Sequence, residues 1–317
     1  MQVRSLNRRA AIVMVLHILG QELCAAESAR KSVNDVVQTM KLDVDLVSLN
    51  VVVTDQNGRP ITALEKKDFK IYEDRIEQPI SFFSHDDMPV SWGLVLDHSR
   101  SMQQVVEDVH QAAVHLLEEG TGQDEMFILT FNHERQLVRD FTSDRHELAN
   151  SIFGLTASGK TAMFDAVALA LDRLQGGIHP KKALILVTDG EDNSSELNFN
   201  ELIEFVEERD VLIYAMGMFE PPDPRRPCLR GRQTRWQLEK LANVTGGKAY
   251  FPSNTRQCHE AVRQIALEVS HQYNLSYYST RQAGGRGWRK LKVVVQPAEG
   301  GRKLVARSRS RYFVPER

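Results

Sequence analysis

The pattern of apolar and polar positions changes character twice along the chain. Between about residues 91 and 271, apolar runs of strand length alternate with stretches in which apolar residues recur at helical spacing, as Val105, Val109 and Leu116 do. This alternation predicts a mostly parallel sheet covered by helices on both faces. On either side of that region, apolar and polar residues alternate one by one, which is typical of half-buried antiparallel strands.

The two flanking regions, residues 43–90 and 272–317, each supply about three predicted strands. In the first, Val47, Leu49 and Val51 alternate with more polar neighbours, and in the second Leu291 and Val293 do so. So few strands rarely form a stable sheet alone. We therefore predict one β-sandwich made from both flanks. The predicted fold class is α/β: a doubly wound, mostly parallel, Rossmann-like sheet (residues 91–271) inserted in that sandwich.

The first 26 residues have the layout of a secretory signal peptide. Arg4, Arg8 and Arg9 precede an apolar run over residues 10–19, and Ala26 follows small residues near a cleavage point. The apolar run is too short to cross a bilayer comfortably. We expect cleavage near Ala26, a linker over residues 27–42, and a mature chain without a transmembrane segment. The expected location is outside the cytoplasm: secreted, periplasmic or in the cell envelope.

Composition narrows the classes of partner. The chain has 317 residues, of which 42% are hydrophobic and 26% charged, an ordinary balance for about two globular domains. Its formal net charge is −2. Because binding to phosphate backbones depends on an excess of Lys and Arg, nucleic acid is not a predicted partner.

Oxygen-bearing side chains cluster where predicted strands end and helices begin. The apolar run over residues 94–96 ends in an Asp-x-Ser-x-Ser motif, and the run over residues 183–188 ends in a second Asp. A Thr lies at the start of the helix between them. The five candidate ligands are Asp97, Ser99, Ser101, Thr161 and Asp189. In open parallel sheets, ligands bind at the carboxyl ends of strands, and an all-oxygen set suits a hard cation such as Mg²⁺.

At these residues the chain resembles the von Willebrand factor type A (VWA) domain. The metal-ion-dependent adhesion site (MIDAS) of that family is written Asp-x-Ser-x-Ser, then Thr, then Asp, and none of the five positions is missing here. The resemblance implies one Mg²⁺ or Mn²⁺ held directly by Ser99, Ser101 and Thr161, with Asp97 and Asp189 binding directly or through water. It also implies an adhesion-type function, in which an acidic side chain of a protein partner completes the coordination.

The flanks extend this resemblance. Residues such as Phe69, Tyr72, Tyr277 and Trp288 make the mature chain most similar to the secreted bacterial VWA-related group of the Acidobacteria type. The loops 132–135, 156–160 and 191–197 are expected to select the partner, since variable loops on a rigid scaffold usually carry recognition. His98 and Arg100, at the variable positions of the metal loop, either shape the ligand or face water.

Two other classes of function stay open from the sequence. Asp97 is placed as the nucleophile of a Mg²⁺-dependent phosphohydrolase would be, but such enzymes usually carry a second Asp two residues later, where this chain has Ser99. A serine hydrolase is not indicated, because Ser99 and Ser101 lack the Gly-x-Ser-x-Gly turn. We expect a protein that is not an enzyme. The third class is a structural envelope protein whose site is unused.

The cysteine and histidine residues lead to two further predictions, one on a disulfide and one on surface positions. Once Cys24 leaves with the signal, Cys228 and Cys258 are either a disulfide or two free thiols in an oxidising compartment. Cys228 belongs to a predicted loop over residues 220–235. His110 and His115 are expected on the surface of the first helix.

Overall fold

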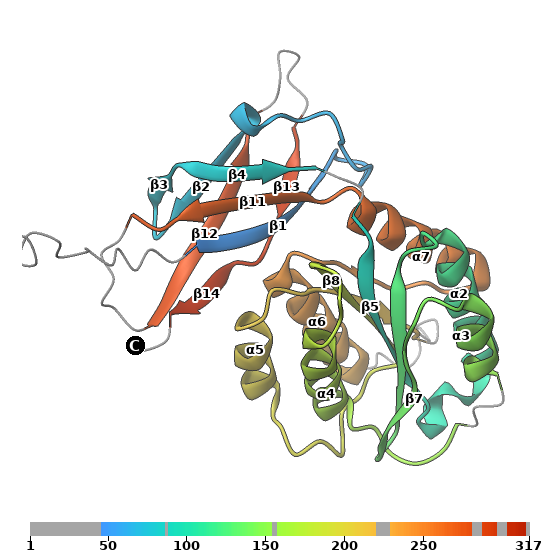
Figure 1. Cartoon of the computed structure of the whole chain (residues 1–317). Helices are drawn as coiled ribbons and strands as arrows, with labels where there is room; N and C mark the ends of the chain where they lie inside the picture. The colour runs from blue at the N-terminus through green and yellow to red at the C-terminus, as the bar shows by residue number, and fades with distance from the viewer. Residues whose placement is uncertain are drawn as a thin grey trace, which may run out of the picture. The chain divides into compact units, whose positions relative to one another are not determined.

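The computed structural model describes residues 46–85, 88–153, 157–219, 229–280, 287–296 and 303–314 (Figure 1). Residues from Asp45 onward form one compact unit. The expected signal peptide and linker lie outside the described residues. None of the helices in this described part of the chain is both long and apolar enough to cross a membrane.

A six-stranded sheet, in the order β10-β9-β8-β5-β6-β7, forms the centre of the α/β region. Only the edge strand β7 is antiparallel to its neighbour. The strands are β5 (Val90–Asp97), β6 (Glu125–Phe131), β7 (Arg135–Thr142), β8 (Lys181–Thr188), β9 (Leu212–Gly217) and β10 (Ala249–Tyr250). All eight residues of β5 are buried, as expected for a central parallel strand covered on both faces.

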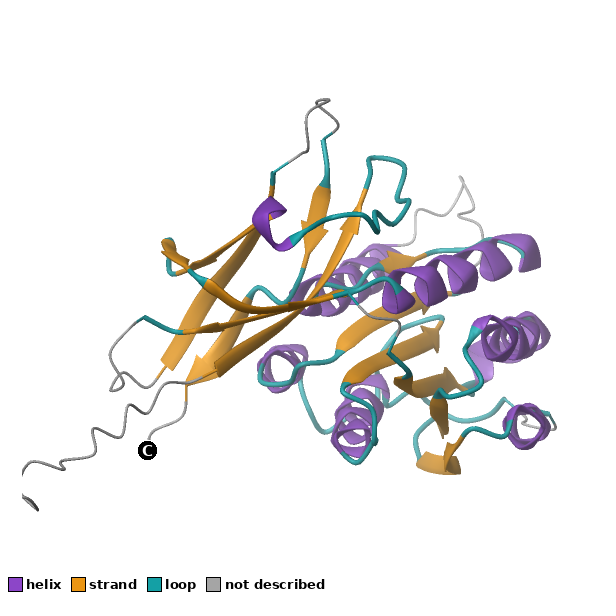
Figure 2. Cartoon of the chain, turned by 45° about the horizontal axis from the view of Figure 1, so that its top comes forward, coloured by secondary structure: helices purple, strands orange, loops and turns teal. Residues whose placement is uncertain are grey.

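Helices cover both faces of this sheet, as Figure 2 shows. They are η2 (Arg100–Gln104), α2 (Val106–Glu119), α3 (Arg145–Ile152), α4 (Met163–Gln175), α5 (Phe199–Glu207), α6 (Leu229–Thr245) and α7 (Thr255–Ser270). Because side chains alternate along a strand, β5 supplies two cores. Trp92, Leu94 and Leu96 pack with residues of α2, α3 and α7. On the other face, Val95 packs with residues of α4, α5 and α6.

The flanks form two four-stranded sheets, ordered β13-β1-β11-β4 and β14-β12-β2-β3. The strands are β1 (Leu46–Thr54), β2 (Phe69–Glu73), β3 (Ile76–Gln78), β4 (Ile80–Ser84), β11 (Tyr273–Tyr278), β12 (Gly287–Val295), β13 (Val305–Arg307) and β14 (Arg311–Val314). Each sheet contains strands from both ends of the chain: β1 pairs with β11, and β2 with β12. The predicted fold class is therefore confirmed, with four strands from each flank where about three were expected.

Helix α6 differs from its prediction. It begins at Leu229, so the long loop expected over residues 220–235 is shorter than predicted. Its first two turns contain three Arg residues, and of the residues 231–235 only Thr234 is buried. A helix start with so little apolar surface has almost no helical hydrophobic pattern, which is why the sequence did not indicate it.

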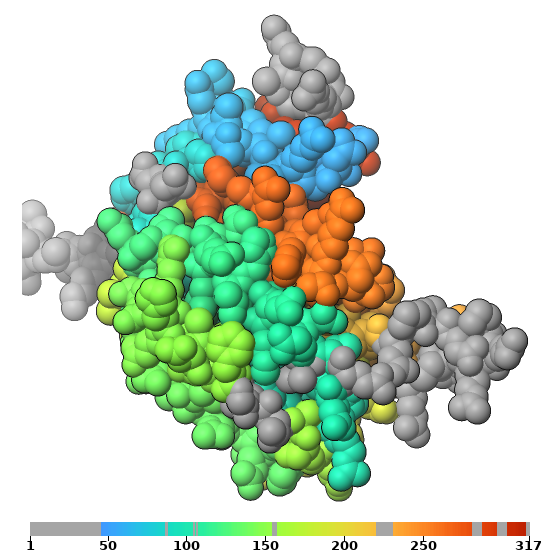
Figure 3. All heavy atoms as spheres, turned by 90° about the vertical axis from the view of Figure 1, so that its right-hand side faces the viewer, coloured from blue at the N-terminus to red at the C-terminus, as the bar shows by residue number. Residues whose placement is uncertain are grey.

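Helices α2 and α7 pack beside each other on one face of the sheet. The hydroxyl of Thr255, at the start of α7, donates a hydrogen bond to Asp108 on α2. The rings of His115 and His259 lie 4.7 Å apart along the same contact. Figure 3 shows these helices as adjoining green and orange surfaces.

Candidate metal centre

The candidate site lies where the chain reverses its direction across the central sheet. Strands β5 and β8 are neighbours, but β6 follows on the far side of β5 and β9 on the far side of β8. The loops that leave β5 and β8 therefore diverge, and a ligand-binding crevice is expected at such a point. Asp97 ends β5, and Asp189 directly follows β8.

Asp97 is buried and held at both carboxylate oxygens. Its Oδ1 accepts a hydrogen bond of 2.8 Å from the backbone N–H of Ser99, and its Oδ2 accepts one of 2.6 Å from the hydroxyl of Thr188. Burial raises the pKa of Asp97 to about 6, against the opposing effect of these hydrogen bonds, and the nearby charge of Asp189 adds to the rise. The two hydrogen bonds thus fix the orientation of the carboxylate. They do not fully offset the cost of burying its negative charge.

The Ser99 and Ser101 hydroxyls lie together near the two carboxylates. The Ser99 and Ser101 hydroxyl oxygens lie 3.1 Å apart, within hydrogen-bonding distance. Burial raises the pKa of Asp189, and the nearby Ser101 hydroxyl opposes this rise. Four of the five predicted site residues therefore lie in one cluster: hydrogen bonds join Asp97, Ser99 and Ser101, and Asp189 lies near enough to affect the pKa of Asp97.

Thr161, the fifth residue, is buried in a segment tied to the metal loop by backbone hydrogen bonds. The N–H of Ser158 donates to the carbonyl of His98 over 2.7 Å, and the N–H of Arg100 donates to the carbonyl of Gly159 over 3.3 Å. Gly159 has a φ of +80°, and a Cβ there would lie 2.4 Å from the ring of His133, so glycine suits this close turn.

The other side of Thr161 is held by the loop after β8. Its N–H donates to the Asn193 side-chain oxygen over 3.1 Å, and its carbonyl accepts from the Asn193 N–H over 3.0 Å. The N–H of Ala162 donates to the carbonyl of Asn132, 2.7 Å away. The three loops expected to select a partner thus meet at one edge of the sheet, around Thr161.

The donor set fits a hard divalent cation. Its members are two carboxylates and three hydroxyls, and Mg²⁺ prefers oxygen ligands at about 2.0–2.1 Å. Two ligands at right angles on such an ion lie about 3 Å apart, close to the 3.1 Å between the Ser99 and Ser101 oxygens. Among the residues that the structure describes, no group of three or more His, Cys, Asp or Glu side chains is gathered to hold a metal. A site here would depend on its hydroxyls.

Three residues that support the site were not predicted from the sequence. Thr188 holds Asp97, and Asn193 holds Thr161. Asp192 accepts hydrogen bonds from the N–H of Phe164, at the start of α4, and from the hydroxyl of Ser195. One sequence feature could have predicted the role of Thr188: it is the polar last residue of a strand whose preceding residues, 183–187, are apolar.

The histidine expectations need correction. His98 is 6% exposed and His110 5% exposed, so His110 is buried and the prediction of a surface position was wrong. Its helix face turns toward His98 in the metal loop, and the two ring centres lie 6.3 Å apart. Burial lowers the pKa of His98 to about 4. Arg100, by contrast, is exposed.

The structure does not decide whether Cys228 and Cys258 form a disulfide or stay as two free thiols. Cys258 is buried at the start of α7, where its Sγ lies 4.0 Å from the Sδ of Met218. Burial raises the pKa of its thiol to about 11. Cys228 lies outside the described residues.

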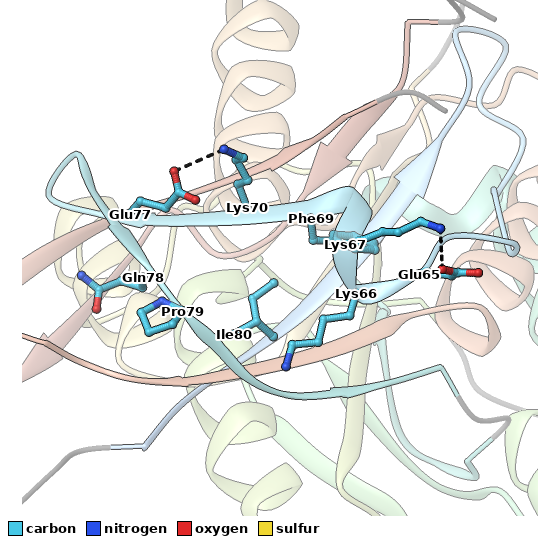
Figure 4. Close-up of a pocket in the computed structure, with 9 residues that line it drawn as sticks. All are labelled: Glu65, Lys66, Lys67, Phe69, Lys70, Glu77, Gln78, Pro79 and Ile80. Atoms are coloured by element: carbon cyan, nitrogen blue, oxygen red, sulfur yellow. Dashed lines mark hydrogen bonds and ion pairs between the residues drawn. The ribbon is translucent and has the colours of Figure 1, made fainter. Parts of the chain in front are cut away.

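A hollow of about 560 Å³ on the β-sandwich is separate from these residues (Figure 4). It lies beside η1 (Lys66–Asp68) and strands β2, β3 and β4. Two of its lysines are paired with glutamates: Lys67 with Glu65 at 2.8 Å and Lys70 with Glu77 at 3.4 Å. None of the candidate metal ligands lines it.

Comparison with solved structures finds similar chains at low identity. The conserved hypothetical protein BatB from Bacteroides thetaiotaomicron is 19% identical, with a TM-score of 0.48 over 57% of this chain and 98% of that chain. A von Willebrand factor type A protein from Catenulispora acidiphila is 12% identical, with a TM-score of 0.49 over 86% of this chain and 74% of that one. The PilB minor pilin from Streptococcus sanguinis is 12% identical, with a TM-score of 0.46 over 59% and 62%.

No curated protein matches this chain. The model of the von Willebrand factor type A domain matches residues 93–264, more than half of the chain. That match begins inside β5, spans every candidate metal ligand and ends within α7. The chain belongs to the von Willebrand factor type A domain family.

Proposed function

We propose that this protein is a metal-dependent, adhesion-type binding module in which a carboxylate from a protein partner completes the coordination of Mg²⁺ or Mn²⁺. The observation that carries the proposal is the gathering of Asp97, Ser99, Ser101 and Asp189 at the point where the sheet reverses direction. Thr161 lies in the adjoining loop.

The residues supply five oxygen donors, whereas Mg²⁺ takes six in near-octahedral geometry. When bound, the cation would offer its remaining position to an oxygen of the partner. Thr188 and the N–H of Ser99 each hold one oxygen of Asp97, so this carboxylate is oriented before any ligand arrives. Ser99 and Thr161 are buried at the base of the site, whereas Ser101 is exposed at its mouth.

Two basic side chains near the site are complementary to an acidic partner, although the exposed Glu191 beside Asp189 opposes them. Arg100 and Lys160 are both exposed, and they lie on two segments joined by the hydrogen bond between Arg100 N–H and Gly159 carbonyl. Positive side chains beside a cation attract an incoming Asp or Glu and suppress basic partners. The loop 191–197, tied to Thr161 through Asn193, would add partner-specific contacts.

We infer a binding role and not phosphohydrolase activity from the surroundings of Asp97. Such enzymes usually carry a second Asp two residues after the nucleophile, as an acid/base, and this chain has Ser99 there. We also propose that the mature protein acts outside the cytoplasm, as the signal-like residues 1–26 indicate.

Titration with Mn²⁺, followed by electron paramagnetic resonance of the free ion, tests the metal site. One Mn²⁺ should bind to the wild-type protein and be displaced by Mg²⁺. Loss of a residue that only supports a metal ligand typically weakens metal binding by about 10–100-fold. Asp97→Ala removes a proposed ligand itself, so it should weaken Mn²⁺ binding by at least that factor. Asp140→Ala is the matched control, because Asp140 is an exposed carboxylate on β7 paired with Arg173. Equal affinity in wild type and Asp97→Ala would exclude this site.

A capture experiment tests the role of the partner. Immobilised wild-type protein and Thr161→Ala are exposed to native extract in Mg²⁺ and then eluted with EDTA. A protein released from the wild type alone, and no longer bound after substitution of one of its acidic residues, supports the proposal. Partners that resist both EDTA and Thr161→Ala would show that recognition lies elsewhere on the chain.

A further inference from the structure

One edge of the β-sandwich lacks the features by which proteins usually protect exposed strands. Edge strands are commonly short, charged, interrupted by proline or covered by another segment. Three of the four edge strands of the two sheets, β3, β13 and β14, have only three or four residues and carry a charged side chain. The fourth, β4 (Ile80–Ser84), has five residues without charge or proline. Within the described part of the chain β4 pairs with β11 alone, so its outer edge keeps unpaired backbone groups.

The hollow of about 560 Å³ lies beside the start of this strand (Figure 4). Pro79 and Ile80 line it on one side, and Phe69 and Lys70 of β2 line it on another. Strand β3 pairs with β2 only over Ile71–Glu73. Among the described residues, the first two of β2 therefore have a strand partner only on their other side, where β12 lies. Two open strand edges thus border one hollow.

Next to the hollow, β4 exposes aromatic surface. Phe83 packs against the core of the sandwich, whereas Phe82 points to the outer face and is 55% exposed. Tyr278 on β11 is 42% exposed and packs edge-on against Phe82, with ring centres 6.3 Å apart. Because side chains on one face of neighbouring strands interact, a strand added to β4 would place its outward side chains against Phe82.

The charge in the hollow suits an acidic ligand. Two of its three lysines are paired with glutamates. The third, Lys66, is exposed, forms no ion pair with any described residue, and directs its side chain toward Ile80 (Figure 4). An acidic side chain is complementary to this position. A second copy of β4 has no carboxylate to offer Lys66, because its five residues are uncharged.

We propose that the outer edge of β4 and the adjoining hollow bind an extended segment of a partner protein by strand addition. In this mode of recognition, backbone hydrogen bonds to the open edge hold the segment, and pockets for alternate side chains select it. An apolar side chain of the segment enters the hollow against Phe69 and Ile80, and an acidic one pairs with Lys66. The site is separate from the candidate metal centre, since none of the proposed metal ligands lines the hollow.

Selection of short peptides from a random phage-displayed library tests the proposal. The full-length protein is immobilised in EDTA, which keeps the metal site empty, so the result does not depend on the proposed metal-dependent function. Selected peptides should alternate apolar and polar residues and contain Asp or Glu. In fluorescence anisotropy, Lys66→Glu should weaken the binding of such a peptide by about 5-fold or more. Replacing the acidic residue of the peptide with Lys should restore part of this loss.

The matched control is Lys303→Glu, because Lys303 is an exposed lysine next to β13, at the opposite edge of the sheet that contains β4. This variant should bind the peptide as the wild type does. Equal affinity in wild type and Lys66→Glu, or a selection that yields no peptide dependent on Lys66, would overturn the proposal.

A measurement on the wild-type protein covers the case in which a variant fails to fold. Hydrogen exchange followed by mass spectrometry should slow in β4 when the peptide is bound, because free N–H groups of the edge become hydrogen-bonded. Slower exchange elsewhere, with none in β4, would contradict strand addition. So would self-association of the protein in sedimentation that Phe82→Lys abolishes, since a second copy would then occupy the edge.

Discussion

At the scale of single residues, the hydroxyl of Thr188 affects both the orientation and the ionisation of the Asp97 carboxyl group. Thr188 donates to Oδ2 over 2.6 Å, and this bond lowers the pKa of a carboxyl that burial has raised to about 6. The bond therefore favours the ionised form, which is the form that binds a cation. Thr188 is itself fully buried, so its hydroxyl has no competing water. A residue outside the proposed ligand set thus influences the charge and orientation of one candidate ligand.

We predict that Thr188→Val, which keeps the shape of the side chain but removes the hydroxyl, weakens Mn²⁺ binding by about 10–100-fold at pH 7. Without the bond the pKa of Asp97 rises further, so more of the carboxyl is protonated. The effect should shrink as the pH is raised. Thr130→Val is the control, because Thr130 is a buried threonine near the end of the neighbouring strand β6. Equal losses in both variants would indicate a general packing effect.

At the scale of elements, a buried carboxylate joins strands from both flanks of the chain. Glu73 on β2 is fully buried and pairs with Arg289 on β12 at 2.6 Å. Its other oxygen accepts a hydrogen bond of 2.8 Å from the Tyr277 hydroxyl on β11, in the opposite sheet. The Ser279 hydroxyl donates to the same Glu73 oxygen as Arg289 does, and the Tyr312 hydroxyl donates to the same oxygen as Tyr277 does. The network specifies how the two sheets of the sandwich face each other.

Glu73→Ala should lower the free energy of unfolding by about 3–5 kcal/mol, because Arg289 would be left buried without its counter-charge. Urea denaturation followed by circular dichroism measures the change. The matched control is Glu77→Ala on β3, whose side chain is 53% exposed and pairs with Lys70. Exposed pairs contribute about 1 kcal/mol or less, so the control should change little. Similar midpoints for the two variants would contradict a stabilising role for the network.

At the scale of the whole compact unit, the C-terminal strands bind the helices of the α/β region. Arg307 on β13 pairs with Glu268 on α7 at 2.6 Å, and Arg311 on β14 pairs with Glu207 on α5. The N–H of Ser310 donates to the carbonyl of Val244, near the end of α6. Three helices are therefore held by one short stretch near the end of the chain.

We expect Arg307→Met to destabilise the protein by about 3–5 kcal/mol, since Glu268 is 1% exposed and would lose its positive partner. Thermal unfolding in parallel with Arg256→Met checks this expectation. Arg256 also lies on α7 and pairs with Glu260, but its side chain is 89% exposed, so its loss should cost about 1 kcal/mol or less. Adding Glu268→Gln to Arg307→Met should restore part of the loss. No recovery in the double variant would argue against a charge effect.

The sequence by itself determined the fold class and the members of the candidate site. Strand runs, helical spacing and turn residues are local patterns, so β5, β8 and the alternating strands of the flanks could be recognised one by one. The convergence of Asp97 and Asp189 also followed, because parallel strands bring their carboxyl ends to one edge of a sheet. The domain family could be named from the same five residues, and the family match confirms it.

Only the tertiary structure decided which distant segments meet. The pairing of Leu49 with Leu275 cannot be read from either segment, because alternation identifies a strand without identifying its partner. Likewise, the burial of His110 depends on what covers that face of α2, and the hydrogen bond from Thr188 to Asp97 joins residues 91 positions apart. Contacts of this kind arise from packing between elements, where the physical partner of a side chain is set by the fold and not by its neighbours in sequence.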